Sequence, residues 1–70
     1  DTARSRVACM TDREREVALL IGRGASNAEI AQTLHLSLAT VKAHVSHLFT
    51  KLEVSNRVQV AIAMHEAGLL

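Results

Sequence analysis

The centre of the chain, residues 26–52, reads SNAEIAQTLHLSLATVKAHVSHLFTKL and decides the fold. It begins with a capping box, in which Ser26 and Glu29 can each accept a hydrogen bond from the backbone amide of the other. The spacing of apolar residues predicts a short helix over residues 27–34 and a longer one over 38–52. Because only about three residues join these two helices, they must cross steeply. This stretch therefore predicts a helix-turn-helix.

Two further helices flank this stretch. Thr11 and Glu14 form a second capping box, and the helix that they open ends near Gly24, the better of two glycines for a left-handed terminal residue. After the long helix, Ser55 or Asn56 caps a last helix. The pattern predicts an all-α fold of four helices, namely a three-helix core with a helix-turn-helix and a C-terminal helix.

The long helix predicted over residues 38–52 has two unlike faces. Its apolar stripe consists of Val41, Val45, Leu48 and Leu52, with Leu38 and Phe49 beside it. The opposite face is small and polar and consists of Ala39, Ala43, Ser46, His47 and Thr50. Lys42 lies at the edge, where its long stem can carry the ammonium outward. No Asp or Glu occurs between Ile30 and Leu52, so this surface is compatible with phosphate.

The last helix is apolar on more than one side. One stripe contains Val58, Ala61, Ile62 and His65, and the other contains Val60, Ala63, Met64 and Ala67. A terminal helix in so small a domain has one side against the core, so we expect the second stripe to bind the same helix of a second copy. Arg57 at the start of this helix is expected to pair with Glu14 or Glu16.

Composition sets the remaining limits. The 70 residues allow one domain, with residues 1–9 expected to be the end of an interdomain linker and 10–70 the domain itself. A single cysteine, Cys9, favours a reducing compartment, the cytoplasm. No apolar run approaches the roughly 18 residues that span a membrane. Neither a catalytic constellation nor a metal-ligand spacing is present, so we expect no enzyme activity, cofactor or metal.

Fixed motifs extend over most of the chain and resemble the helix-turn-helix domain of LuxR/NarL/FixJ-type bacterial regulators. They are Met10-Thr11-x-Arg13-Glu14-x-Glu16-Val17, Gly24-x-Ser26-Asn27-x-Glu29-Ile30-Ala31, Leu36-Ser37-x-x-Thr40-Val41-Lys42-x-His44-Val45, Lys51-Leu52-x-Val54 and Arg57. The resemblance implies a four-helix output domain of a transcription regulator that binds promoter DNA and dimerises through its last helix. A two-component response regulator is the expected parent, with a ligand-sensing quorum regulator as the alternative. RNA polymerase is a further partner that the resemblance suggests.

The resemblance also implies which residues meet DNA. The base-facing set is Lys42, Ala43 and Ser46, extended by His47 and Ala39. Phosphate contacts are expected from helix starts, hydroxyls and a cation, namely Ser26, Asn27, Ser37, Thr40 and Lys51. Lys51 is equally compatible with an ordinary structural or solvated lysine. A different class of function, a module whose third helix docks a partner protein, also remains open.

Overall fold

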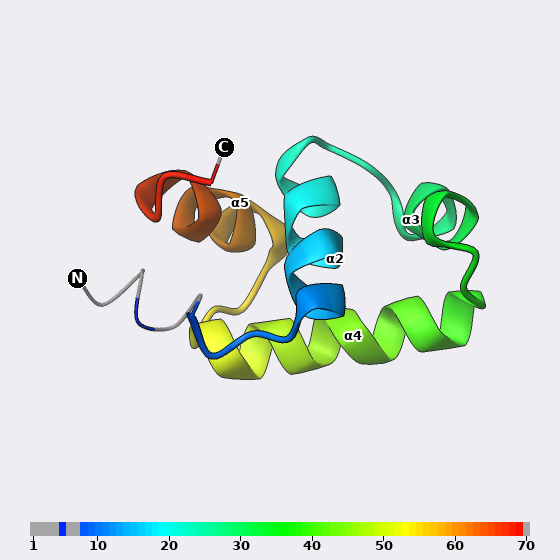
Figure 1. Ribbon diagram of the computed structural model, residues 1–70, viewed down its shortest axis with the longest axis horizontal. Helices are drawn as coiled ribbons and strands as arrows, with labels where there is room; N and C mark the ends of the chain where they lie inside the picture. The colour runs from blue at the N-terminus through cyan, green and yellow to red at the C-terminus, as the bar shows by residue number, and fades with distance from the viewer. Residues whose placement is uncertain (1–4, 6–7, 70) are drawn as a thin grey trace.

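The computed structural model describes residues 5 and 8–69, and that part of the chain contains helices without any strand (Figure 1). The helices are α2 (Asp12–Gly22), α3 (Asn27–Leu34), α4 (Leu38–Leu52) and α5 (Arg57–Glu66). The prediction of an all-α fold with these four helices is confirmed. Most of the predicted linker, residues 1–4 and 6–7, lies outside the described residues.

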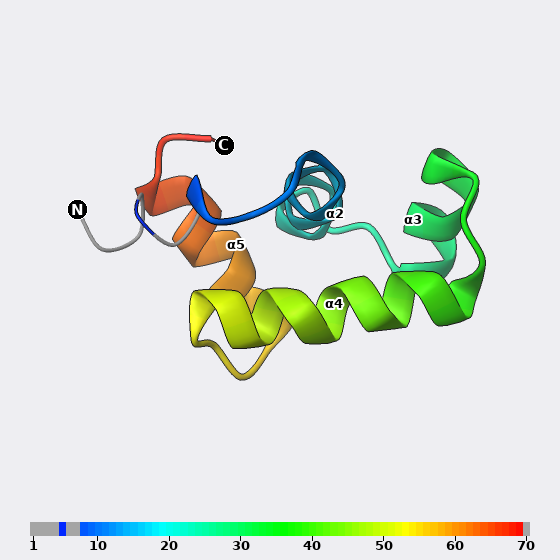
Figure 2. The ribbon, with the colours of Figure 1, turned by 60° about the horizontal axis from the view of Figure 1, so that its bottom comes forward.

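The longest helix, α4, forms the base on which the others are arranged. In Figures 1 and 2, α2 lies over the middle of α4, with α3 near one end of α4 and α5 near the other. α2 packs against both α4 and α5, and α3 packs mainly against α4. The short connection after Leu34 brings α3 and α4 together at a steep angle, as the sequence predicts.

Local side-chain hydrogen bonds explain where the helices begin. Glu14 N donates to Thr11 Oγ1 at 3.1 Å while Thr11 N donates to Glu14 Oε1 at 2.9 Å, so the first capping box is complete. Asn56, not Ser55, caps α5 by accepting from Gln59 N at 2.9 Å. These bonds satisfy backbone amides that have no partner within their helix.

Two helices end on residues that the sequence pattern did not single out. His35 closes α3 with φ 57° and Glu53 closes α4 with φ 54°, both in the left-handed region. That region is uncommon for residues other than glycine. Gly24, which was predicted to adopt it after α2, does so with φ 89°. The left-handed residue at His35 is what turns the chain sharply between α3 and α4.

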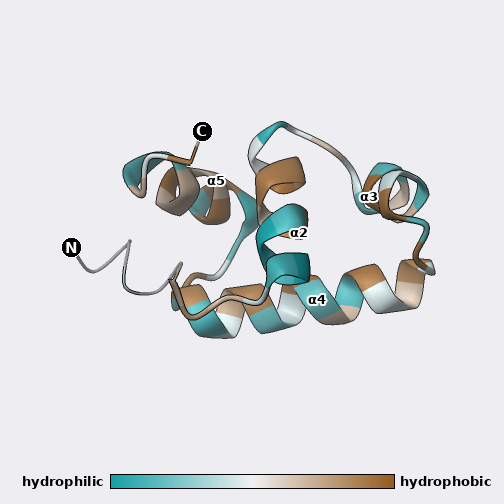
Figure 3. Cartoon of the chain, in the orientation of Figure 1, coloured by the Kyte–Doolittle hydropathy of each residue, from teal (hydrophilic) through white to brown (hydrophobic). Residues whose placement is uncertain are grey.

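All four helices contribute to one core. Its fully buried large side chains are Val17, Ile30, Val41, Leu48, Leu52, Val60 and Met64. The buried stripe predicted for α4 is confirmed, since all four of its members are buried, although Leu38 beside it is 45% exposed. Figure 3 shows the hydrophobic colour of α4 concentrated along the edge turned toward α2, with paler and teal residues along the opposite edge. The core therefore fixes which face of α4 is left outside.

The structure reverses the two stripes predicted for α5. Val60 and Met64 have no exposed surface and Ala67 is 9% exposed, because α5 turns this side onto α2. The prediction that this stripe, which includes the half-buried Ala63, meets a second copy is therefore wrong. The exposed apolar residues of α5 are Val58, at 68%, and Ile62, at 50%.

Candidate nucleic-acid interface

The outer face of α4 carries all five residues that were predicted to face DNA bases. Ala39, Lys42, Ala43, Ser46 and His47 are all exposed. No acidic residue occurs on α4. The packing of the opposite stripe into the core holds this face outward. The structure thus brings the predicted set together on one side of one helix.

The chemistry of this face is that of short side chains around a cation. Ala39 and Ala43 end at Cβ, so another surface can approach the helix backbone closely. Within the described residues, the Lys42 ammonium has neither a hydrogen bond nor an ion pair, so no acidic side chain neutralises its charge. The nearby Thr50 hydroxyl donates to the Ser46 carbonyl at 3.3 Å, and the Ser46 hydroxyl has no hydrogen-bond partner among residues 5 and 8–69. A major groove admits one α-helix and offers acceptors for such a cation and hydroxyl.

The start of α4 adds donors to the same surface. Ser37 Oγ accepts from Thr40 N at 3.1 Å and lies 2.8 Å from Thr40 Oγ1. A hydrogen bond between two hydroxyls uses one hydrogen, so the other remains available as a donor. The amides of Leu38 and Ala39 have no partner within the helix, and no acid occupies its first turn. These groups suit a phosphate.

The start of α3 is less open than the sequence predicts. Ser26 N donates to Glu29 Oε1 at 2.9 Å, so this amide is already satisfied, and Ser26 can offer only its hydroxyl hydrogen. The Ser26 amide also lowers the pKa of Glu29, which keeps a negative charge at this turn. The amides of Asn27 and Ala28 have no helical partner and are the donors that remain.

Arg57 reaches this same turn, and not the acids of α2. Its NH1 donates to Asn27 Oδ1 at 2.6 Å and its NH2 donates to the Ala25 carbonyl. The prediction that Arg57 pairs with Glu14 or Glu16 is wrong, since Glu14 pairs with another cation and Glu16 lies beside Arg13. The only sign in the sequence that Arg57 contacts another part of the domain is its position at a helix start, where the helix dipole disfavours a cation.

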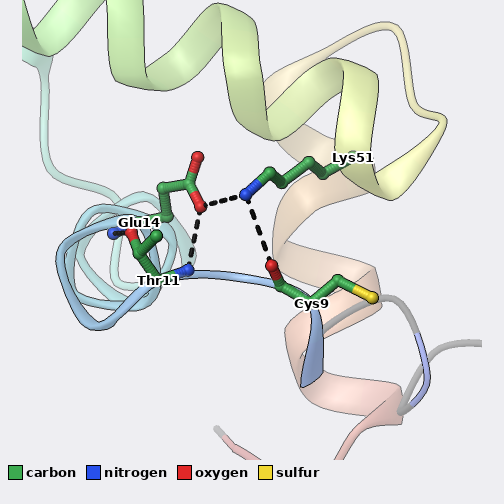
Figure 4. A network of polar contacts seen from close by, with 4 residues as sticks. All are labelled: Cys9, Thr11, Glu14 and Lys51. Atoms are coloured by element: carbon green, nitrogen blue, oxygen red, sulfur yellow. Dashed lines mark hydrogen bonds and ion pairs between the residues drawn. The ribbon is translucent and has the colours of Figure 1, made fainter.

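That other cation is Lys51, near the end of α4. Its Nζ lies 2.7 Å from Glu14 Oε1 and donates to the Cys9 carbonyl at 3.3 Å (Figure 4). The Glu14 side chain is 6% exposed and that of Lys51 is 36% exposed. The charge of Lys51 is balanced by Glu14 inside the domain, which favours the structural role, and a phosphate contact by Lys51 stays a prediction. Lys51 joins α4 to α2 and to the segment before α2.

The hydrogen bond from Lys51 also sets the ionisation of Glu14. This bond is the main reason that the pKa of Glu14 lies below its ordinary value of 4.5, and the Thr11 amide lowers it further, while burial acts in the opposite direction. A carboxyl whose pKa is lower in the folded state stabilises the fold above its unfolded-state pKa. That stabilisation is lost as the pH falls from about 4.5 through the folded-state pKa.

Replacing this carboxyl should therefore flatten the acid side of the stability profile. We expect Glu14→Gln to lower the free energy of unfolding by about 1 kcal/mol at neutral pH, a modest loss because solvent weakens an ion pair with a partly exposed lysine. Thermal melts from about pH 7 to about pH 3 should then show a smaller fall for the variant than for the wild type. Parallel profiles would contradict the role assigned to this pair.

Residues 5 and 8–69 contain no group of three or more His, Cys, Asp or Glu side chains placed to hold a metal ion. None of the helices formed by these residues has the length and apolar character needed to cross a bilayer. The outer face of α4 is thus the site on which the sequence and the structure converge.

The steep crossing of α3 and α4, packed under α2, defines a helix-turn-helix domain. The family model described as bacterial regulatory proteins, luxR family, matches residues 8–64, and the chain belongs to this family. Proteins named response regulator protein VraR, from Staphylococcus aureus, Staphylococcus saprophyticus and Staphylococcus epidermidis, are each 46% identical to it over 61 residues. Each match covers 87% of this chain and 29% of the relative, so the chain spans less than a third of these relatives.

Proposed function

We propose that this chain is a sequence-specific DNA-binding domain that inserts α4 into the major groove. The observation that carries the proposal is the outer face of α4, which combines short side chains, an unpaired ammonium and no acid. A face that is merely solvated normally carries acids as well as bases. Membership of a family of bacterial regulatory proteins supports the same conclusion.

Each residue of the face has a proposed role. Lys42 donates to the O6 and N7 acceptors of guanine or to a phosphate, and Ala43 contacts a thymine methyl group. Ser46 offers an adaptable hydrogen bond, and His47 extends the same set. Phosphate contacts come from the starts of α3 and α4, where Asn27 and the residues around Ser37 offer donors.

The domain is further proposed to act as a dimer in the output part of a response regulator. The relatives that match this chain are named response regulator proteins. With a net charge of +1, one copy has few cations for binding DNA, so contacts from two copies on adjacent half-sites add usefully. The exposed residues Val58 and Ile62 on α5 are the proposed contact between copies. A regulator of genes acts in the bacterial cytoplasm, where the chromosome lies.

The direct test compares duplex binding by the wild type and Lys42→Ala. We expect the variant to bind a duplex selected by the wild type about tenfold more weakly, since one good base contact contributes about 1–3 kcal/mol. Arg13→Ala is the matched control, because it removes a cation that lies on α2 beside Glu16 and outside the candidate interface. A wild type that retards no duplex would exclude the proposal and favour a protein-docking module. Equal losses of affinity in the two variants would mean that Lys42 contributes only through its charge and makes no specific contact with a base.

A further inference from the structure

Arg57 connects two parts of the domain that otherwise pack little against each other. It is the first residue of α5, yet its guanidinium lies against the turn that begins α3. NH1 donates to Asn27 Oδ1 and NH2 donates to the Ala25 carbonyl, and both bonds are partly buried. α3 itself packs against α4 and α2. The guanidinium thus links α5 to the start of α3.

The hydrogen-bond partners of Arg57 do not neutralise its positive charge. A cation at the first residue of a helix is opposed by the helix dipole, so its position there calls for a compensating contact. The two recorded acceptors are an amide oxygen and a backbone carbonyl, which carry no net charge. The positive charge therefore remains beside the first turn of α3.

The guanidinium also decides how the Asn27 amide is turned. Arginine has only donors, so the atom of Asn27 that faces it must be the acceptor Oδ1. Nδ2 is consequently turned away from Arg57, and within the described residues it has no hydrogen-bond partner. The Asn27 side chain is thus held in one orientation, and the backbone amides of Asn27 and Ala28 in the same turn have no partner within the helix.

We propose that Arg57 is a positioning residue for DNA binding, which acts by fixing the first turn of α3 and by orienting the Asn27 amide toward a backbone phosphate. This inference rests on the proposed function, in which Asn27 contacts phosphate. It adds that the contact depends on a residue of α5, the helix proposed to join two copies. The start of α3 is then positioned from the same helix that is proposed to pair the subunits.

A double-mutant cycle with a salt titration tests the proposal. Arg57→Ala, Asn27→Ala and the double variant are compared with the wild type on a duplex selected by the wild type. We expect each single variant to bind about tenfold more weakly. The slope of log affinity against log salt should fall by clearly less than about 0.9 in each, because the amide that meets the phosphate is neutral and a change of that size marks the loss of a cation that neutralises a phosphate. We expect the double variant to match the single variants to within about twofold, because both remove the same contact.

Each alternative gives a different result. If Arg57 only stabilises the fold, the folded Arg57→Ala variant binds the duplex as tightly as the wild type does, and the positioning role is overturned. Additive losses of affinity, with the salt slope lowered by about 0.9 in Arg57→Ala but not in Asn27→Ala, would mean that Arg57 binds its own phosphate, which also overturns the positioning role. If Arg57→Ala does not fold by circular dichroism, Arg57→Lys replaces it, since lysine keeps the charge but lacks the planar two-donor fork. Failure of the wild type to bind any duplex would instead reject the proposed function itself.

Discussion

Ala43→Glu should abolish duplex binding while the domain stays folded. Ala43 is exposed in the middle of the α4 face, and glutamate is a good helix former, so the helix should tolerate it. In a major groove, however, the new carboxylate would face acceptors and phosphates and would hold the helix away from the base edges. We expect a loss of about a hundredfold or more, which corresponds to about 3 kcal/mol. Fluorescence anisotropy with a labelled duplex measures the loss.

The control for this variant adds the same charge elsewhere. Gln59 is exposed on α5, and its Oε1 accepts from Ser55 N at 2.7 Å, an interaction that a glutamate oxygen can also make. Gln59→Glu should change affinity by no more than about threefold, because it alters only the net charge. If Ala43→Glu binds DNA as well as this control does, α4 does not enter the groove.

Met64→Asp should unfold the domain. Met64 has no exposed surface, and an aspartate in its place would be a buried charge with no recorded partner. The expected cost is about 4 kcal/mol or more, which equals or exceeds the whole stability of a domain of this size. Circular dichroism should show loss of helix at neutral pH. Retained helicity with a cooperative melt would contradict the burial of this side of α5.

Ile62→Asp, two positions earlier on the same helix, should behave in the opposite way. Ile62 is 50% exposed, so the charge stays in water and the monomer remains folded. If α5 joins two copies through Val58 and Ile62, this variant should sediment as a monomer under conditions in which the wild type dimerises. It should also lose cooperative DNA binding. Unchanged dimerisation would place the contact between copies elsewhere.

The sequence predicts the helices well because their signals are local. Thr11 and Ser26 each cap a helix together with a glutamate three residues later, and both pairs form as expected. The buried stripe of α4 is equally clear, because its other face contains no large apolar residue. The endings at His35 and Glu53 are not predictable in this way, since neither residue type favours the left-handed region as glycine does.

What the sequence does not predict depends on how distant elements meet. Both stripes of α5 are apolar, so only the packing of α5 on α2 decides that Met64 is buried while Ile62 is exposed. The partners of Lys51 and Arg57 lie 37 and 30 residues away along the chain, too far for any helical spacing to indicate them. The base-facing residues of α4 could be named because the core contacts of one helix determine its free face.

The central claim is that the outer face of α4 is the surface that meets duplex DNA. Titration of the isotope-labelled chain with a selected duplex, followed by amide chemical shifts, tests it most directly. The account predicts the largest changes at Ala39, Ala43, Ser46 and His47, with smaller changes at the starts of α3 and α4. Changes confined to α2 and α5, with those four amides unaffected at saturation, would contradict it.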